Sequence, residues 1–181
     1  MEMKVFFCFS FFVLLSVTSL ARSQVVKPGH DQIKEFHFHI YWLQNNPEQE
    51  WQALTLKEKI VDEVHNGNFT VVCDGITNEI LPTINEDEVP GFNVQPIGPH
   101  SCGSFETWVP RESYAKFLSF ILLNRGDLTI FIHPLGNNEI DDHTIHASWL
   151  GQSYPLDLSP LSAVGGDDPQ YPELGLGYNA M

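Results

Sequence analysis

The sequence predicts an α+β fold of the ferredoxin-like class, the split βαβ arrangement βαββαβ, in which a four-stranded antiparallel sheet carries two helices on one face. Three observations predict it. Apolar and polar residues alternate strictly at 36–42, apolar residues recur at helical spacing in two later segments, and three further short runs have the character of strands. The sheet face without helices is left open, so a homodimer or the chain's own C-terminal segment is expected to cover it.

The first strand is expected at residues 36–42, because successive side chains of a strand point to opposite faces of the sheet. The face turned toward the helices carries the apolar members of the run: Phe36, Phe38, Ile40 and Trp42. The opposite face carries the remaining side chains: His37, His39 and Tyr41. This strand is therefore expected to separate an apolar core from a face that carries chemically reactive groups.

The first helix is expected to begin at Thr55, which forms a capping-box pattern with Glu58. Asn66-Gly67 is expected to end it. Its buried stripe is made of four aliphatic residues: Leu56, Ile60, Val61 and Val64. Residues 68–90, which contain Gly and Pro and a run of acids, are expected to form a mostly exposed insertion.

The second and third strands are expected at 92–97 and 104–109, as a hairpin joined by residues 98–103. The fourth strand is expected at 128–133 and is ended by Pro134. A second helix lies between the third and fourth strands, and Arg125-Gly126 gives it a basic last turn and a glycine stop. Its apolar face carries residues at helical spacing: Tyr114, Phe117, Leu118 and Ile121.

The chain is expected to divide into four parts. Residues 1–23 have the features of a signal peptide, with a basic start, an apolar run at 5–20 and small residues before the cleavage point. Residues 24–35 form a polar lead-in, residues 36–161 the folded domain, and residues 162–181 a flexible, Gly-rich tail. The apolar run is short for a bilayer span of about 20 residues, so a secreted protein with no membrane anchor is expected.

Length and charge restrict the function. A chain of 181 residues with 43% hydrophobic content suits one ordinary globular domain. The net charge of −14 repels the phosphate backbone of nucleic acids and attracts cations, including divalent metal ions. The sequence therefore predicts no nucleic-acid partner.

Two modifications are expected of a secreted chain. Cleavage of the signal peptide removes Cys8 and leaves Cys73 and Cys102, an even pair that predicts one disulfide in an oxidising compartment. Asn68 opens an Asn-x-Thr sequon in a polar stretch, which predicts glycosylation on a surface loop.

The histidines suggest where chemistry occurs. His37 and His39 present two imidazoles on one side of the first strand. The fourth strand is expected beside the first and antiparallel to it, which brings His133 next to His37. The third strand is expected on the other side and parallel to the first, which carries His100 to the same end. Imidazoles gathered in this way suit Fe(II) or Zn(II), and Glu106 would complete a two-histidine, one-carboxylate set.

Three motifs occur in order along the chain. The first is His37-x-His39-x-Tyr41 and the second Pro96-Ile97-Gly98-Pro99-His100. The third joins Ile132-His133-Pro134-Leu135-Gly136, Asp142-His143-Thr144 and Ala147-Ser148-Trp149-Leu150-Gly151. Together they resemble the signatures of the small DOPA 4,5-dioxygenase family. Two positions depart from that pattern: Asn93 stands where the family usually has a histidine, and Ser101 where it usually has a proline.

This resemblance implies a ferredoxin-like dimer that uses O₂ and a non-haem Fe(II) for extradiol cleavage of L-DOPA, to a product that cyclises into yellow pigments. The mechanism we expect on this basis is bidentate binding of the catechol to iron. The expected ligands are two histidines and a carboxylate: His37, His133 and Glu106. The expected acid/base or substrate-orienting groups are the other histidines of the motifs: His39, His100 and His143. Tyr41 and Trp108 are expected to line the ring pocket, with ordinary packing as the alternative.

The sequence leaves three functions open. The first is a secreted dioxygenase that cleaves a small catechol with O₂, with Fe(II) as its cofactor and Zn(II) in a purified form. The second is a secreted acidic protein that keeps this fold without catalysis and serves as a binding or extracellular-matrix component. The third is a metal hydrolase or isomerase on the same site. Catechol turnover by iron-loaded protein distinguishes the first from the second.

Overall fold

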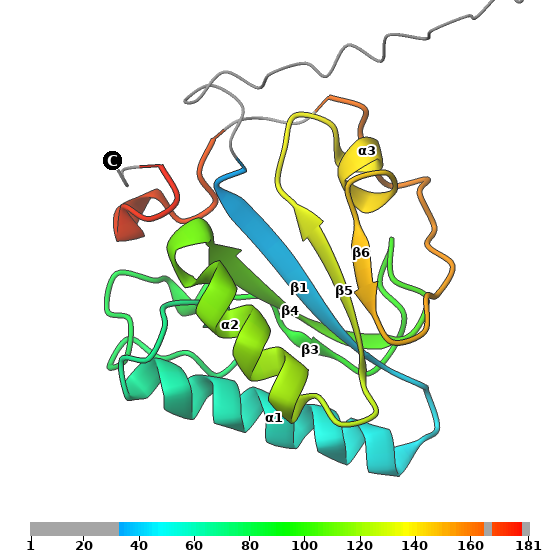
Figure 1. The fold of residues 1–181 in the computed structure, drawn as a ribbon, viewed down its shortest axis with the longest axis horizontal. Helices are drawn as coiled ribbons and strands as arrows, with labels where there is room; N and C mark the ends of the chain where they lie inside the picture. The colour runs from blue at the N-terminus through cyan, green and yellow to red at the C-terminus, as the bar shows by residue number, and fades with distance from the viewer. Residues whose placement is uncertain (1–32, 165–167, 179–181) are drawn as a thin grey trace, which may run out of the picture. The chain divides into compact units, whose positions relative to one another are not determined.

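The structure is a computed structural model that describes residues 33–164 and 168–178. The expected signal peptide, residues 1–23, and most of the polar lead-in, residues 24–35, lie outside the described residues. Over the described ranges the fold is α+β, with six strands in one antiparallel sheet and three α-helices (Figure 1). The strand order is β2-β4-β1-β5-β6, with β3 also paired to β4. The expected number of four strands is therefore wrong.

The bounds of the elements are as follows. The strands are β1 (Glu35–Trp42), β2 (Val72–Cys73), β3 (Phe92–Asn93), β4 (Gly103–Pro110), β5 (Thr129–Pro134) and β6 (Ser148–Leu150). The α-helices are α1 (Pro47–His65), α2 (Arg111–Asn124) and α3 (Glu139–His143), and short 3-10 turns lie at Glu86–Glu88 and Pro172–Leu174.

β1 lies between β4 and β5 and is antiparallel to both. The prediction that the third strand, here β4, runs parallel to β1 is therefore wrong. A crossover helix makes the strand after it parallel to the strand before it, and the return into β4 then reverses the direction. The start of β4 consequently lies beside the end of β1, where Gly103 pairs with Trp42. Gly103 is needed there, because a Cβ would collide with the Trp42 indole.

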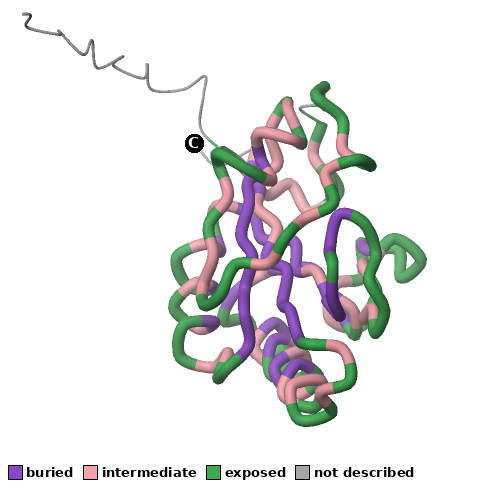
Figure 2. Tube along the Cα trace, turned by 90° about the vertical axis from the view of Figure 1, so that its right-hand side faces the viewer, coloured by how far each residue is buried: buried purple, intermediate pink, exposed green. Residues whose placement is uncertain are grey.

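The apolar core lies between the sheet and the two long helices. Phe38 and Ile40 of β1 are fully buried in it, as the alternation in the sequence predicts. Ile60 of α1 and Phe117 of α2 meet them from the helix side. Burying an aliphatic or phenyl side chain of this size stabilises a fold by about 1.5–3 kcal/mol. Figure 2 shows the strands as the buried centre and the outer helix surface as exposed.

α1 begins at Pro47, eight positions before the predicted start at Thr55. Asn46 caps it, with its side-chain oxygen accepting a hydrogen bond of 3.2 Å from the Gln49 amide, and Pro47 takes the first helical position. The Asn46-Pro47 pair is thus the true start signal. The end prediction is confirmed: Asn66 is the C-cap and Gly67 follows with a left-handed φ of 74°.

The segment 68–90 is more buried than expected. Val72 and Cys73 form β2 on the edge of β4, and Val71 before them is also fully buried. The predicted strand at 92–97 shortens to β3, because Pro96 has no amide hydrogen to donate to a strand ladder. The single second strand of the prediction is therefore replaced by two short pieces, β2 and β3, both paired with β4.

The C-terminal segment 168–178 packs on the folded domain instead of forming the predicted flexible tail. Tyr171 is 2% exposed and meets Trp108 edge-on, with ring centroids 5.0 Å apart. Its hydroxyl donates to the Glu88 carbonyl at 3.2 Å. This segment lies near the start of β1 (Figure 1) and covers part of the sheet face opposite the helices. One of the two covers expected for that face, the chain's own C-terminal segment, is thus observed.

Two further observations concern the surface. Among the described residues, no helix combines the length and apolar character needed to cross a bilayer. Asn68 is exposed directly after α1, and its side-chain amide donates to the Glu63 carboxylate. Its glycosylation stays a prediction.

The predicted disulfide is not formed: Cys73 and Cys102 are both free thiols. Cys73 packs in the core on the helix side of the sheet, whereas Cys102 packs with Tyr41 and Phe131 on the other side. The sheet separates the two sulfur atoms, so the spacing of the cysteines in the sequence gave no guide to their pairing. Burial raises the pKa of Cys73 to about 12 and that of Cys102 to about 11.

We expect both thiols to react slowly with iodoacetamide in the folded protein, because the reactive thiolate is scarce at these pKa values and both groups are buried. In protein that starts at residue 24, unfolding in urea without a reductant should expose both thiols for complete labelling, counted by intact mass. Labelling that appears only after reduction would show that a disulfide forms after all.

Candidate metal and active site

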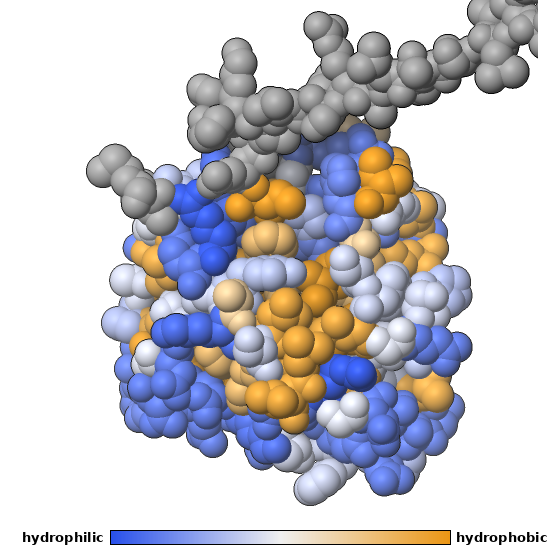
Figure 3. All heavy atoms as spheres, in the orientation of Figure 1, coloured by the Kyte–Doolittle hydropathy of each residue, from blue (hydrophilic) through white to orange (hydrophobic). Residues whose placement is uncertain are grey.

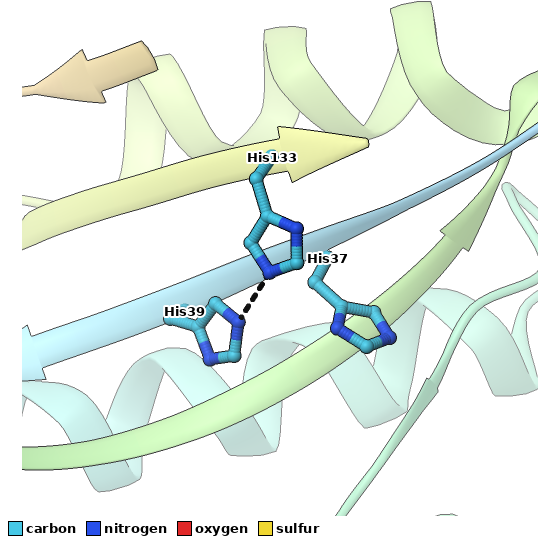
Figure 4. A group of neighbouring side chains, drawn as sticks. All are labelled: His37, His39 and His133. Atoms are coloured by element: carbon cyan, nitrogen blue, oxygen red, sulfur yellow. Dashed lines mark hydrogen bonds between the residues drawn. The ribbon is translucent and has the colours of Figure 1, made fainter. Parts of the chain in front are cut away.

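Three imidazoles meet on the sheet face opposite the helices. His37 and His39 point the same way because they lie two residues apart on β1, and His133 of β5 is the direct cross-strand partner of His37. One ring nitrogen from each lies within 4.8 Å of the other two (Figure 4). The predicted convergence of His37 and His133 is therefore confirmed, and His39 joins them.

The spacing of these nitrogens fits one metal ion. Nε2 of His39 lies 3.1 Å from Nε2 of His133. Metal–imidazole bonds are about 2.0–2.1 Å long, so two nitrogens at roughly a right angle on one ion lie about 3 Å apart. His133 donates from Nδ1 to the Pro134 carbonyl at 2.8 Å, which makes its Nε2 the acceptor nitrogen. Without a metal ion this nitrogen accepts the hydrogen bond from Nε2 of His39. The donor set and its spacing both suit a divalent transition metal.

Burial keeps the imidazoles of His39 and His133 in the neutral form that binds metals. His39 is 2% and His133 3% exposed, and desolvation lowers the pKa of each well below its ordinary value. The neighbouring imidazoles lower these pKa values further. Protons therefore compete weakly with a metal ion for these nitrogens near neutral pH.

The predicted ligand Glu106 lies beside this group but outside it. One of its carboxylate oxygens is 3.2 Å from Nε2 of His37, and the other is 3.8 Å from Nδ1 of His39. An ion bound by Nε2 of His39 requires the proton of that ring on Nδ1, which faces Glu106. A carboxylate in this place orients a ligand imidazole by accepting its outer N–H group, and the distance to His37 is the one short enough for such a hydrogen bond.

His100 extends the imidazole group toward the end of β1. Its ring centroid is 4.0 Å from that of His39, and its Nδ1 lies 2.5 Å from the hydroxyl of Tyr41. The buried hydroxyl needs an acceptor for its proton, so Tyr41 donates and the ring proton of His100 stays on Nε2. Desolvation lowers the pKa of His100 to about 4. Tyr41 thus orients His100, and its ring packs with Cys102 and Phe131 instead of lining the predicted ring pocket.

His143 reaches the group from α3. Its ring centroid is 3.9 Å from that of His133, and its Nδ1 donates to the Glu139 carbonyl at 2.8 Å. Asp142, 4% exposed, holds α3 against the loop after β5, because it accepts hydrogen bonds from the Gly136 amide at 2.7 Å and from Nδ1 of His146 at 3.1 Å. Nε2 of His143 is left as an acceptor.

A cavity of about 350 Å³ opens beside the imidazoles. Its lining combines the imidazoles with the loops before β3 and β4: His37, His39, Pro90, Gly91, Asn93, Ile97, Gly98, Pro99, His100, Ser104, Glu106 and His143. Trp108, predicted to line it, is absent from this lining and packs under Tyr171. Of the two positions that depart from the family pattern, Asn93 lies at the cavity wall and Ser101 is exposed.

A smaller cavity of about 170 Å³ also borders His37, together with His133. Asp168 and Tyr178 of the C-terminal segment help to line it. Gln170 of the same segment contacts His37 directly. Sequence reasoning missed this segment, because its Gly-rich composition is typical of flexible ends and its two aromatic residues, Tyr171 and Tyr178, belong to no periodic pattern.

Comparison with known families decides the classification. The model of the Dopa 4,5-dioxygenase family matches residues 36–160, which include all three motifs and every imidazole of the site. The chain belongs to the Dopa 4,5-dioxygenase family.

Individual relatives agree with the family match. The chain is 40% identical over 150 residues to a DOPA 4,5-dioxygenase of Amanita muscaria, which covers 82% of this chain and 59% of that protein. It is 32% identical over 136 residues to an uncharacterized 21.2 kDa protein of Botryotinia fuckeliana, which covers 68% and 61%. The chain thus spans about three fifths of the length of these two relatives.

A solved structure shares the fold. The crystal structure of a candidate dioxygenase from Nostoc punctiforme matches with a TM-score of 0.52, covering 72% of this chain and 95% of that chain. At 21% identity this similarity shows the fold alone.

Proposed function

We propose that this protein cleaves the aromatic ring of L-DOPA or a related catechol in the extradiol position, with O₂ and a non-haem Fe(II). The observation that carries the proposal is the group of three imidazoles, His37, His39 and His133, beside a cavity of about 350 Å³. Family membership and the DOPA 4,5-dioxygenase of Amanita muscaria support it.

His37, His39 and His133 would hold the iron. Bound Fe(II) supplies a Lewis acid for the two catechol oxygens and a means of activating O₂. In protein purified without iron, Zn(II) would bind the same nitrogens. We assign Glu106, predicted as a ligand, to the adjacent role of accepting the outer N–H group of His37, because one of its oxygens lies 3.2 Å from Nε2 of that ring. Its other oxygen lies 3.8 Å from Nδ1 of His39.

Two further imidazoles that line the cavity, those of His143 and His100, can accept a proton and donate a hydrogen bond during the reaction. His143 has its own proton on Nδ1, held by the Glu139 carbonyl, so Nε2 can accept the proton that a catechol hydroxyl loses on binding. His100 has its proton on Nε2, because Tyr41 donates to its Nδ1, so it can donate a hydrogen bond to negative charge on the substrate. The cavity lining thus offers one proton acceptor, His143, and one hydrogen-bond donor, His100.

The experiment is anaerobic loading of the protein with Fe(II), addition of L-DOPA, and admission of air. We expect a yellow product whose mass and absorption match the cyclised extradiol product. The His143→Gln variant keeps hydrogen-bonding capacity but is a poor base, and we expect its turnover number to fall by about 10²- to 10⁴-fold. Folded, iron-loaded protein that gives no product would favour the second candidate function, a binding protein without catalysis.

We also propose that the protein is secreted. The apolar run at 5–20 after a basic start, with small residues at 21 and 23, supports a signal peptide cleaved after residue 23. Glycosylation of Asn68, which is exposed, is part of this proposal. Treatment with a glycosidase and N-terminal sequencing of protein recovered from the culture medium test both points.

The assembly and exact class of the fold belong to the proposal as well. We class the fold as ferredoxin-like, with β6 and the C-terminal segment as additions. A homodimer remains a prediction: Leu122 and Leu123 are 54% and 85% exposed on α2, and a second copy would cover them. Figure 3 shows that apolar residues gather near the middle of the face on which α1 and α2 lie. Light scattering measures the assembly directly.

A further inference from the structure

Gln170 connects the C-terminal segment to the metal site. Its side-chain oxygen Oε1 lies 2.6 Å from Nε2 of His37. Gln170 follows the region that the family model matches, which ends at residue 160. The contact joins residues 133 positions apart in the sequence. A side chain from outside the family's matched region is therefore part of the surroundings of a candidate metal ligand.

Contacts at Gln170 and after it fix its position. Its backbone amide donates to both carboxylate oxygens of Glu35, at 3.2 and 3.3 Å. The next residue, Tyr171, is buried against Trp108 and donates to the Glu88 carbonyl. Further along, the Gly177 amide donates to both carboxylate oxygens of Glu112, at 3.0 and 2.9 Å. The segment is therefore anchored at Gln170 itself and at two positions after it.

The contact determines which nitrogen of His37 can bind a metal. Gln170 Oε1 and Glu106 Oε1 both approach Nε2, at 2.6 and 3.2 Å, and both are acceptors, so Nε2 of His37 carries the ring proton. A neutral imidazole has one N–H, so Nδ1 keeps its lone pair. In Figure 4 one ring nitrogen of His37 faces the other two imidazoles and the second faces away from them.

We propose that Gln170 is a positioning residue for the metal site: it accepts the Nε2 proton of His37, and thereby fixes the tautomer and ring orientation in which Nδ1 of His37 binds the ion. The proposal rests on the metal site of the proposed function. An amide suits this role because it accepts the hydrogen bond without adding a charge. The C-terminal segment thus contributes a residue that orients a metal ligand of the site.

The first test measures metal affinity. Co(II), a spectroscopic substitute for Fe(II), is titrated into metal-free wild-type protein and into Gln170→Leu, which keeps most of the side-chain volume and loses the acceptor. Loss of an outer partner typically weakens metal binding about 10- to 100-fold, and we expect the lower end, because Glu106 remains as a second acceptor. Gln170→Glu keeps an acceptor at this position, so it should bind Co(II) at least about tenfold more tightly than Gln170→Leu does.

The matched control is Glu173→Ala, an exposed position in the same segment, which should leave the affinity unchanged. Urea denaturation must show that wild type and Gln170→Leu are both folded. Equal affinity of the two proteins for Co(II) would then overturn the inference and leave the proposed function standing. Wild-type protein that binds no metal would overturn both.

The second test needs no metal. Nitrogen-15 NMR of histidine-labelled, metal-free protein identifies the tautomer of His37. We expect the proton on Nε2 in the wild type, and a mixture of tautomers in Gln170→Leu. A wild-type His37 with its proton on Nδ1 would show that the Gln170 amide is turned the other way and would overturn the proposal.

Discussion

Replacing His133 by alanine is expected to weaken binding of Fe(II) or Zn(II) by at least about 100-fold, since loss of an outer partner alone costs about 10- to 100-fold and His133 is itself a ligand in this account. Its Nε2 lies 3.1 Å from Nε2 of His39, and its Nδ1 is held by the Pro134 carbonyl. The variant keeps the imidazoles of His37 and His39 and lacks the third candidate ligand. Metal content after dialysis and a competitive titration with a chelator measure the effect, and catechol turnover should fall to background.

The matched control is His65→Ala. His65 is exposed at the end of α1 and lies outside the group of imidazoles. We expect the same metal affinity and turnover as in the wild type. Because His133 is buried, urea denaturation of the metal-free proteins must show that His133→Ala is folded. A folded His133→Ala variant with wild-type metal content would refute the three-imidazole site.

The second large effect concerns the core. Phe117→Ala is expected to lower the free energy of unfolding by about 3–5 kcal/mol, the usual range for removing a buried phenylalanine. Phe117 of α2 is fully buried, and its ring meets Phe38 at 5.0 Å and Phe69 at 5.2 Å, both edge-on. The substitution removes the contact between α2 and the centre of the sheet and leaves a cavity. Urea denaturation measures the loss in the free energy of unfolding, and an m-value equal to that of the wild type shows that only stability has changed.

Ser119→Ala is the control for this prediction. Ser119 lies on the same helix and is exposed, so its truncation should change the free energy of unfolding by less than about 0.5 kcal/mol. A loss below about 1.5 kcal/mol for Phe117→Ala would mean that α2 does not pack on Phe38 as described.

The central strands were predictable because one face of each is apolar. The alternation at 36–42 set the face of β1 correctly, and the positions of β4, α2 and β5 followed from their patterns to within one or two residues at most ends. The direction of β4 was wrong for a different reason. Direction depends on how the chain crosses over and returns, and the two short pieces β2 and β3 gave no strong pattern from which to infer it.

The site was predictable where two elements of clear register meet. His37 and His133 are direct partners in the β1–β5 pair, so the prediction that they converge needed only the strand order. The role of His39 was harder to predict, because the inward approach of its Nε2 to His133 depends on side-chain rotamers. Gln170, Tyr171 and the free state of the cysteines depend on contacts between distant segments that no local pattern encodes.

We propose that an iron ion held at the imidazole site enables the protein to cleave a catechol with O₂. An oxygen-uptake measurement with limiting L-DOPA and iron-loaded protein, with the product mass recorded in parallel, tests this proposal. We expect one O₂ consumed per L-DOPA, no hydrogen peroxide, and a ring-opened product that contains both atoms of the O₂ before it cyclises. Folded, iron-loaded protein that consumes no oxygen, or that releases hydrogen peroxide and a quinone, would contradict it.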